Sequence, residues 1–527
     1  MSNSFFYKLH TTIAGGAIII SFFSILSRLL GLIRDRLLAS TFGAGDTLDV
    51  YYAAFRLPDL IFNTLVLGAL SAAFIPVFLE YWHKNKEESW EIASSILNIL
   101  LIVLFILGGL FFIFAPFLIS HLVAPGFGLE KQVMTVRLTR IMLISIFFFT
   151  ASNLAGAILN SFKKFLAYSI APVMYNLGII FGIIFLVPLL GEIGLAFGVV
   201  LGSFLHLLVQ IPSLLKTGFS WKPVFNFKHK GVRKVGLLML PRTFALAVNQ
   251  VNRLVITNIA STLTVGSIAV YNLADNLQSF PIGIFAIPLA IACFPYLSES
   301  AARNEKEKFA VHFSVTLRRV IFLIVPTSLF IFFLRAQIVR LVLGAGHFSW
   351  RDTILTLKTL GYFSLSLFAQ ALIPLLARAF YALQDTKTPV FIGFLSVGFN
   401  LIFALCFTQT LGTPGLALAF SLASIINFLL LYIFLRKKLK WFDEKKIIFS
   451  FFKILIISLI AVFFLQIAKT IMGHLVNMRT FSGVFCQFIV AGLVGLVVYL
   501  FLAILLKCEE IEVLRLFLGK KFNFLKR

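Results

Sequence analysis

The chain has 527 residues, of which 60% are hydrophobic and 13% are charged. A soluble globular protein is nearer ~45–50% apolar and ~25% charged, so the composition excludes an ordinary soluble enzyme. The formal charge of +25 could suit a nucleic-acid partner, but most of the 46 Lys and Arg lie in short loops between long apolar segments. Multi-span membrane proteins place their cations in this way, so we expect no binding to nucleic acid.

Fourteen segments are apolar and long enough to cross a bilayer as helices, which takes about 20 residues. The second, fourth, eighth and tenth are longer than a bilayer requires, so they should tilt, kink or project into water. The predicted fold class is an all-α polytopic membrane protein with about fourteen transmembrane helices. The spans are 13–33, 47–79, 92–116, 134–160, 168–189, 193–215, 236–262, 266–295, 314–335, 353–383, 388–410, 414–435, 447–470 and 481–506.

The loop charges predict how the chain is oriented in the membrane. The N-terminus, the even-numbered loops and the C-terminus together hold about 29 Lys and Arg, against about 8 in the odd-numbered loops. Basic loops stay in the cytoplasm, so both termini should be cytoplasmic in the inner (cytoplasmic) membrane of a bacterium. The first apolar run follows Lys8 but no small-residue cleavage site comes soon after it, so we expect it to be retained as span 1.

An internal repeat is visible at an offset near 220 residues. Lys163 corresponds to Lys387, Asn176 to Asn400, and the glycines Gly191 and Gly194 to Gly412 and Gly415. Six spans per repeat is an even number, which predicts two parallel six-helix lobes related by an axis along the membrane normal. The lobes should be residues 1–220 and 221–440. Residues 441–527 should hold spans 13 and 14 and a basic cytoplasmic tail.

Several charged residues lie inside predicted spans, where each costs about 2.5–3.5 kcal/mol. Such residues should face one another across a water-filled cavity between the lobes and bind the substrate. The alternative for any single residue is an ion pair at the end of a helix, most of all for Arg34, Arg36 and Asp59. Cations slightly outnumber carboxylates, which favours an anionic substrate, and Arg suits phosphate through its two-point contact. The predicted substrate-binding residues are Arg28, Arg34, Asp35, Asp49, Arg56, Arg242, Arg253 and Asp275.

No enzyme signature is present. The chain has no P-loop, no HExxH and no GxSxG sequence, and its four Cys and eight His have no metal-ligand spacing. We therefore predict no catalytic residue, no cofactor and no metal site. Transport should be driven by a gradient or by the membrane potential.

Residues 27–35, with Arg28, Gly31, Arg34 and Asp35, resemble the span 1 signature of the MurJ (MviN) family. These are lipid II flippases of the multidrug/oligosaccharidyl-lipid/polysaccharide exporter superfamily, and the resemblance extends over essentially the whole chain. Further matching segments are 42–45, Asp49, 54–58, 124–127, 156–160, 274–275, 280–281 and 381–389.

The resemblance implies a function. Such proteins move undecaprenyl-pyrophosphate-linked disaccharide-pentapeptide (lipid II) from the cytoplasmic to the outer leaflet for peptidoglycan synthesis. They alternate access between two lobes around a cationic cavity, and a groove at spans 13 and 14 takes the polyprenyl tail. The implied partners are lipid II and membrane lipids, with proteins of cell-wall synthesis as further candidates. Arg28, Arg34, Asp35 and Asp49 match positions on which the family relies.

The chain also departs from the family pattern. Phe62 and Asn63 stand where many relatives have two Arg, Leu67 where they often have Glu, and Asn276 where they have Arg. Arg56, Arg242 and Arg253 are the candidate replacements for the missing cations. Residues 400–404 of span 11 contain no acid, so no sodium site is predicted.

Three other functions fit less well. An exporter of another polyprenyl-linked glycan or of a cationic drug would share the superfamily, but drug exporters usually have twelve spans. A polyprenyl-phosphate glycosyltransferase needs carboxylates in a loop outside the membrane, and the outward loops here are short and almost free of acids. A non-transporting scaffold would not need polar residues buried in the membrane.

Overall fold

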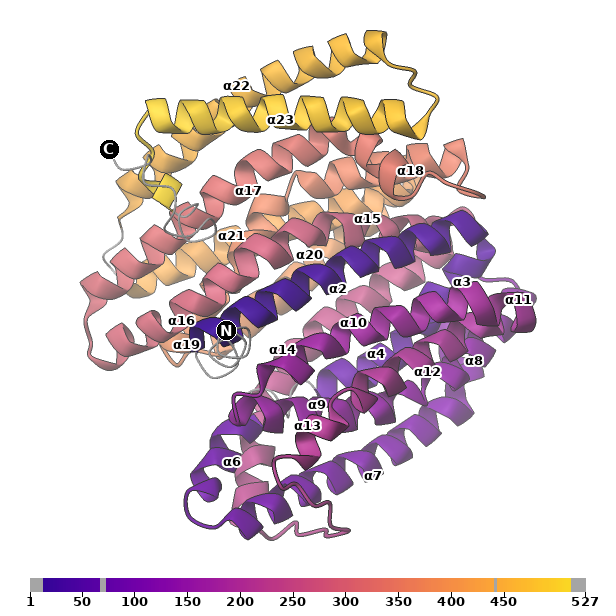
Figure 1. Cartoon of the computed structure of the whole chain (residues 1–527), viewed down its shortest axis with the longest axis vertical. Helices are drawn as coiled ribbons and strands as arrows, with labels where there is room; N and C mark the ends of the chain where they lie inside the picture. Colours follow the sequence, from indigo (N-terminus) through magenta and orange to yellow (C-terminus); the bar gives the residue numbers. More distant parts are fainter. Residues whose placement is uncertain (1–12, 67–72, 440–442, 513–527) are drawn as a thin grey trace, which may run out of the picture. The chain divides into compact units, whose positions relative to one another are not determined.

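The computed structural model describes residues 13–66, 73–439 and 443–512. Every regular element in these ranges is a helix, which confirms the predicted all-α class (Figure 1). The chain divides into two compact units, Met1–Ala269 and Val270–Arg527. The two lobes expected at 1–220 and 221–440, with a separate 441–527 region, stay a prediction.

The first unit is built from long helices with short connections. Their core contains Phe74, Phe78 and Trp90, packed with aliphatic side chains from neighbouring helices. The helical elements are α2 (Ile13–Phe42), α3 (Asp46–Ala54), α4 (Arg56–Ile61), the π-helical η1 (Phe62–Val66), α6 (Ile75–Trp82), α7 (Lys86–Leu118), η3 (Ile119–Val123), α8 (Leu129–Met142), α9 (Ser145–Ser161), α10 (Phe165–Phe181), η4 (Gly182–Leu186), α11 (Val187–Leu190), α12 (Ile193–Leu208), α13 (Ile211–Leu215), α14 (Lys230–Ser261) and the start of α15 (Ser267–Pro281).

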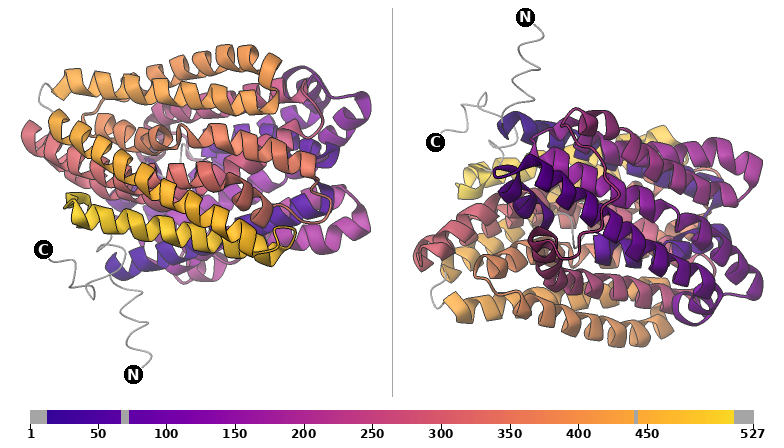
Figure 2. Two further views of the ribbon diagram at one scale, coloured as in Figure 1. Left: turned by 90° about the horizontal axis from the view of Figure 1, so that it is seen from above. Right: turned by 90° about the horizontal axis from the view of Figure 1, so that it is seen from below.

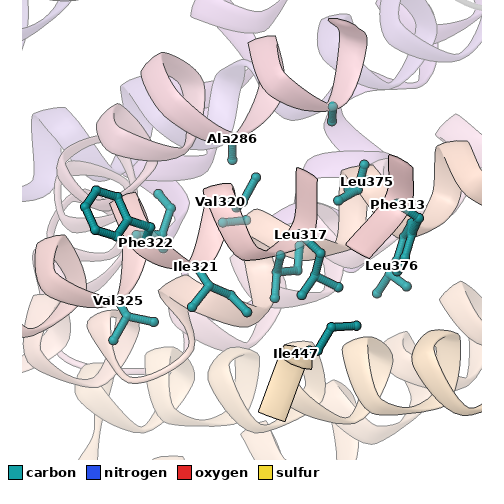
Figure 3. Packing of buried hydrophobic residues seen from close by; sticks show 14 of the residues in the cluster. Ala286, Phe313, Leu317, Val320, Ile321, Phe322, Val325, Leu375, Leu376 and Ile447 are labelled. Carbon is teal, nitrogen blue, oxygen red and sulfur yellow. The ribbon is translucent and has the colours of Figure 1, made fainter. Parts of the chain in front are cut away.

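The second unit has its own apolar core. Figure 3 shows part of it, where Phe313, Leu317 and Ile321 of one helix meet Leu375 of a second and Ile447 of a third. The last four long helices run as two side-by-side pairs, coloured orange and yellow in Figure 1 and Figure 2. The elements after α15 are η5 (Ile282–Ala286), α16 (Ile287–Ala302), α17 (Lys306–Val342), α18 (Trp350–Ser364), α19 (Leu367–Ala382), α20 (Lys387–Leu411), α21 (Thr413–Leu439), α22 (Glu444–Leu475), α23 (Phe481–Leu505) and the 3₁₀ turn η6 (Glu509–Ile511).

Ten described helices are long and apolar enough to cross a membrane, or eleven when the bent pair α18–α19 counts as one span. The pair bends by 47°, so the tenth predicted span does kink. Three other helical stretches, α2, α3–η1 and α14, are not among these candidates, and all three carry charged residues in their interiors. The count of fourteen spans is therefore still a prediction.

Backbone conformations recur at the spacing of the sequence repeat. Lys163 and Gln384 both have a φ of +57°, and they are 221 residues apart. Gly191 and Gly412 both have a φ of +62° at the same separation. Each position ends one helix and turns the chain into the next, so the repeat extends to the turns as well as to the sequence.

One pair of helices departs from this symmetry. The repeat predicts that α14 should behave like α2, and α2 packs against α10 in the first unit. Helix α14 instead packs against α4, η1 and α6, so it belongs to the same compact unit as the helices that precede it. The residues of α14 can therefore contact those of span 2 directly.

Small residues let α10 and α12 approach closely. A Cβ atom added at Gly178 would overlap the backbone of Gly202, and one at Gly182 would overlap that of Gly198. Spacing of four residues between glycines on both helices is the pattern by which helices pack tightly in membranes. This contact fixes the position of α10, which carries an asparagine used in the site described next.

Candidate substrate-binding site

Arg34 is held by two partners in the first unit. Its Nε and Nη2 atoms donate to Asp35 Oδ1 at 3.0 and 2.8 Å. Its Nη1 atom donates to Asn176 Oδ1 of α10 at 3.1 Å. Asn176 is in turn fixed by hydrogen bonds from its Nδ2 to the Ser27 hydroxyl and the Pro172 carbonyl, both at 3.1 Å. Arg34 and Asp35 therefore form a clamp that joins α2 to α10.

Asp49 has a structural role. Its carboxylate accepts hydrogen bonds from the backbone N–H groups of Gly266 at 2.8 Å and Ala269 at 2.9 Å. These N–H groups lie at the start of α15, where the free donors of a helix N-terminus favour a carboxylate. Lys131 Nζ lies 3.7 Å from the same carboxylate and 2.6 Å from that of Asp46. Asp49 thus caps α15 and is already neutralised in part.

Arg56 joins span 2 to α14. The side chain is buried, and its Nε donates to Thr257 Oγ1 at 2.7 Å. Asp59, one turn further along, is within electrostatic reach of both Arg56 and Arg253. Arg253 is exposed on α14, and its side chain makes no hydrogen bond or ion pair within the described part of the chain. Its guanidinium is available to a ligand.

Arg28 differs from Arg34 although both lie on α2. Its side chain is half-buried, and within residues 13–66, 73–439 and 443–512 it makes neither a hydrogen bond nor an ion pair. A guanidinium without partners is costly in a helix that crosses the membrane, as span 1 is predicted to do. Among the predicted site residues of this unit whose side chains the structure describes, Arg28 and Arg253 are the two whose side chains make no hydrogen bond or ion pair.

Two predicted residues cannot be placed with this group. The side chain of Arg242 lies outside the described residues. Asp275 belongs to the second unit, where its Oδ1 accepts from Gln278 Nε2 at 2.9 Å. Gln278 Oε1 accepts in turn from Gln370 Nε2 of α19, also at 2.9 Å. Asp275 is thus the end of a polar chain within its own unit.

Sequence reasoning missed several groups that take part in these networks. Asn176 was noticed as a repeat residue and not as a partner of Arg34. Glu192, which accepts a hydrogen bond of 2.5 Å from Thr47, lines a pocket of about 660 Å³ together with Asp46 and Lys131. An amide inside a span and an acid between two spans were weak signals, because no spacing along the sequence relates either residue to its partner.

Comparison with known proteins places this arrangement in context. Residues 38–485 match the family described as Lipid II flippase MurJ. The chain is 31% identical over 434 residues to the lipid II flippase MurJ of Burkholderia cenocepacia, an alignment that covers 80% of this chain and 83% of that protein.

Solved structures agree with the family match. A lipid II flippase MurJ in an inward closed conformation superposes with a TM-score of 0.78 at 28% identity, over 94% of this chain and 100% of that one. An inward-facing multidrug resistance MATE family transporter of the MOP superfamily superposes with a TM-score of 0.65 at 17% identity. The match covers 80% of this chain and 98% of that one. That second likeness shows a shared fold only. The chain belongs to the MurJ family of lipid II flippases.

Proposed function

We propose that this protein, a multi-pass transporter of the inner membrane, carries lipid II from the cytoplasmic to the outer leaflet by alternating access of its two halves. Membership of the MurJ family over residues 38–485 is the observation that carries the proposal. The distribution of Lys and Arg among the loops supports cytoplasmic termini. Proteins of cell-wall synthesis remain candidate partners.

The pyrophosphate of lipid II is the group that most needs help to cross. It carries about two negative charges, and moving it into apolar surroundings without partners would be prohibitive. Arg28 offers a half-buried guanidinium with no partner in the described chain. Arg34 uses three of its five N–H donors on Asp35 and Asn176, which leaves two. We assign Arg28 as the first contact of the pyrophosphate, with Arg34 and Arg253 as further cations.

The other predicted residues have supporting roles. Asp35 orients Arg34 and offsets part of its charge, so the site does not hold the anion too tightly for release. Asp49 holds the start of α15 at Gly266 and Ala269, and Arg56 holds α14 beside span 2. Arg242 and Asp275 remain candidate substrate-binding residues because each is a charge inside a predicted span.

The membrane potential can give the transport a direction. Moving negative charge outward across an inside-negative membrane is favourable by about 2.3 kcal/mol per charge per 100 mV. Because the Arg side chains stay with the protein, the free energy is available to the lipid as it leaves. No ATP site is required for this step.

The polyprenyl tail needs an apolar path. Helices α22 and α23 pack against α17, and large apolar side chains on them, including Phe452, Phe463 and Phe501, are exposed. Almost the whole MATE transporter, 98% of its length, superposes on 80% of this chain. This chain is therefore longer than that fold requires. Extra apolar helices suit a lipid-linked substrate better than a small drug.

The proposal is tested by replacing the chromosomal flippase of a depletion strain with this protein. Cells should keep growing, and lipid II should reach the outer leaflet, where an externally added lipid II-cleaving enzyme can degrade it. Arg28→Ala should abolish both effects at normal protein levels in the membrane. Lipid II that accumulates in the inner leaflet despite expression of the unmodified chain would contradict the proposed function.

A further inference from the structure

A second pocket in the first unit has an uncharged lining, unlike the pocket lined by Asp46, Lys131 and Glu192. It measures about 320 Å³ and lies among α2, η1, α9, α10 and α12. None of its lining residues is an acid, a Lys or an Arg. The residues are Ile20, Ser24, Phe62, Phe149, Asn153, Tyr168, Ser169, Pro172 and His206. A pocket of this size with aromatic walls and a few polar groups is typical of a small-molecule site.

The aromatic wall is a packed cluster. The rings of Phe62 and Phe149 have centroids 5.2 Å apart, and those of Phe149 and His206 are 5.4 Å apart. The ring of Tyr175, which is not among the lining residues, packs edge-on against that of Phe149 with the centroids 5.1 Å apart. Phe149 is thus held on several sides, so the wall presents a fixed apolar face to a ligand.

The polar groups of the pocket are available. Asn153 Nδ2 donates to the Phe149 carbonyl at 2.8 Å, and Asn153 Oδ1 has no partner among the described residues. The hydroxyl of Ser24 also makes no hydrogen bond within them. An amide oxygen and a hydroxyl can together accept from, and donate to, an uncharged polar ligand.

His206 adds a further acceptor through its hydrogen bonds behind the wall. Ser152 Oγ lies 3.0 Å from the His206 carbonyl oxygen, 2.6 Å from His206 Nδ1 and 2.5 Å from Gln210 Nε2. A hydroxyl has one proton, so all three contacts are satisfied only if it donates to the carbonyl and accepts from both nitrogens. This assigns the proton of the imidazole to Nδ1. The other ring nitrogen, Nε2, is then a hydrogen-bond acceptor on a residue that lines the pocket.

The position of the pocket relates it to the pyrophosphate site. Ser24 lies one helical turn before Arg28 on α2, so the two side chains share a face and are separated by about 6 Å along the axis. In lipid II the pyrophosphate is bonded directly to the first sugar ring. A ring that occupies the pocket would therefore bring its phosphates to the level of Arg28.

We propose that the pocket of Ser24, Phe149, Asn153 and His206 binds the pyrophosphate-linked amino-sugar ring of the substrate. The absence of ionic groups from its lining excludes the pyrophosphate and the charged pentapeptide, whereas an N-acetylated sugar offers hydroxyl and amide groups and apolar ring faces. The inference rests on the proposed function. It assigns the pocket as the place where a glycan-bearing lipid is distinguished from a bare polyprenyl pyrophosphate.

The test compares two ligands that differ only in the headgroup beyond the phosphates. The full chain in nanodiscs is titrated with lipid II and, separately, with undecaprenyl pyrophosphate. Asn153→Leu should weaken binding of lipid II about tenfold, the loss of roughly one hydrogen bond, and leave binding of undecaprenyl pyrophosphate unchanged. Ser24→Ala, a smaller change that preserves the helix, should have the same selectivity with a smaller effect. Asn160→Leu makes the matched substitution on α9 outside the pocket and should bind both ligands as the unmodified chain does.

The outcomes separate the two proposals. Unchanged binding of lipid II by Asn153→Leu and Ser24→Ala, or equal loss for both ligands, would overturn the sugar pocket. Arg28→Ala should weaken both ligands, because both carry the pyrophosphate. If Arg28→Ala weakens both while the pocket variants change neither, the sugar pocket fails and the proposed anion site stands. If Arg28→Ala changes neither ligand, the anion site fails independently of the pocket.

Discussion

Substitution of Arg34 by Lys keeps the positive charge but removes the planar guanidinium that donates to two acceptors. In the structure, three N–H donors of Arg34 bind two acceptors, Asp35 Oδ1 and Asn176 Oδ1, on two helices. The three donors of Lys leave from a single atom and cannot reproduce the planar fork. We therefore expect Arg34→Lys to lose at least one charge-assisted hydrogen bond.

The size of the loss follows from the burial of the partners. The side chain of Arg34 is 20% exposed and that of Asp35 is 4% exposed, so solvent replaces little of what is removed. A hydrogen bond to a charged group contributes about 1.5–3 kcal/mol. Arg34→Lys should therefore destabilise the first unit by about 2 kcal/mol or more. Arg28→Lys removes no hydrogen bond within the described chain and should leave stability nearly unchanged.

Two measurements on the same pair of variants test this reasoning. Thermal unfolding of the purified protein in detergent should show a midpoint several degrees lower for Arg34→Lys and near the unmodified value for Arg28→Lys. Complementation of a flippase-depleted strain should fail for Arg34→Lys and be partial for Arg28→Lys. Equal midpoints and equal growth for the two variants would show that the clamp between α2 and α10 contributes nothing, and would refute the argument.

Three further predictions concern packing, capping and pH. Gly178→Leu should prevent close approach of α10 and α12 and sharply lower the amount of folded protein in the membrane. Gly109→Leu should be tolerated, because no atom lies within 4 Å of the new Cβ. Equal expression of the two variants would contradict the packing. Asp49→Ala should lower the thermal midpoint through the loss of a helix cap, by about 1–2 kcal/mol of stability, and an unchanged midpoint would exclude the capping role. Burial raises the pKa of the Asp385 carboxyl, but hydrogen bonds from Lys438 and Thr388 outweigh it and hold the pKa below its usual value. This carboxylate therefore stabilises the fold above its unfolded pKa of about 3.9, and the stabilisation is lost as the pH falls through the lower folded pKa. Asp385→Asn should then lower the midpoint at pH 7 and have a smaller effect near pH 3; an equal effect at both values would disprove the electrostatic account.

Much of the fold could be predicted because the signals that define each helix are local in the sequence. Apolar length defined the spans, and excess length identified where α18 and α19 form one bent span. The repeat was visible because turns need particular residues, as Gly191 and Gly412 show with their shared φ of +62°. The packing of α14 onto span 2 could not be predicted, because it depends on contacts between distant parts of the chain that leave no periodic signal.

The candidate site was predictable as a set of residues and not as a set of partners. Arg34 and Asp35 are neighbours in sequence, so their ion pair was an open alternative from the start. The bond from Arg34 to Asn176 joins residues 142 positions apart, and that from Asp49 to Gly266 joins residues 217 apart. No spacing rule connects such pairs. The sequence identified costly charges, whereas their individual roles depend on the three-dimensional contacts.

The contacts show which of those charged residues already have partners in the fold and which can still bind a ligand. Asp49 and Arg56 have partners that lie on other helices of the same unit, so the cost of placing them in the membrane is offset within the fold. Arg28 has no such offset in the described chain, and its cost of about 2.5–3.5 kcal/mol is removed only when an anion or water reaches it. Binding of a pyrophosphate at Arg28 therefore gains stabilisation that the empty protein lacks. Arg34 gains less from the same anion because Asp35 already offsets its charge. A site with one unsatisfied and one satisfied cation can thus attract the lipid strongly and still release it, as a transporter must.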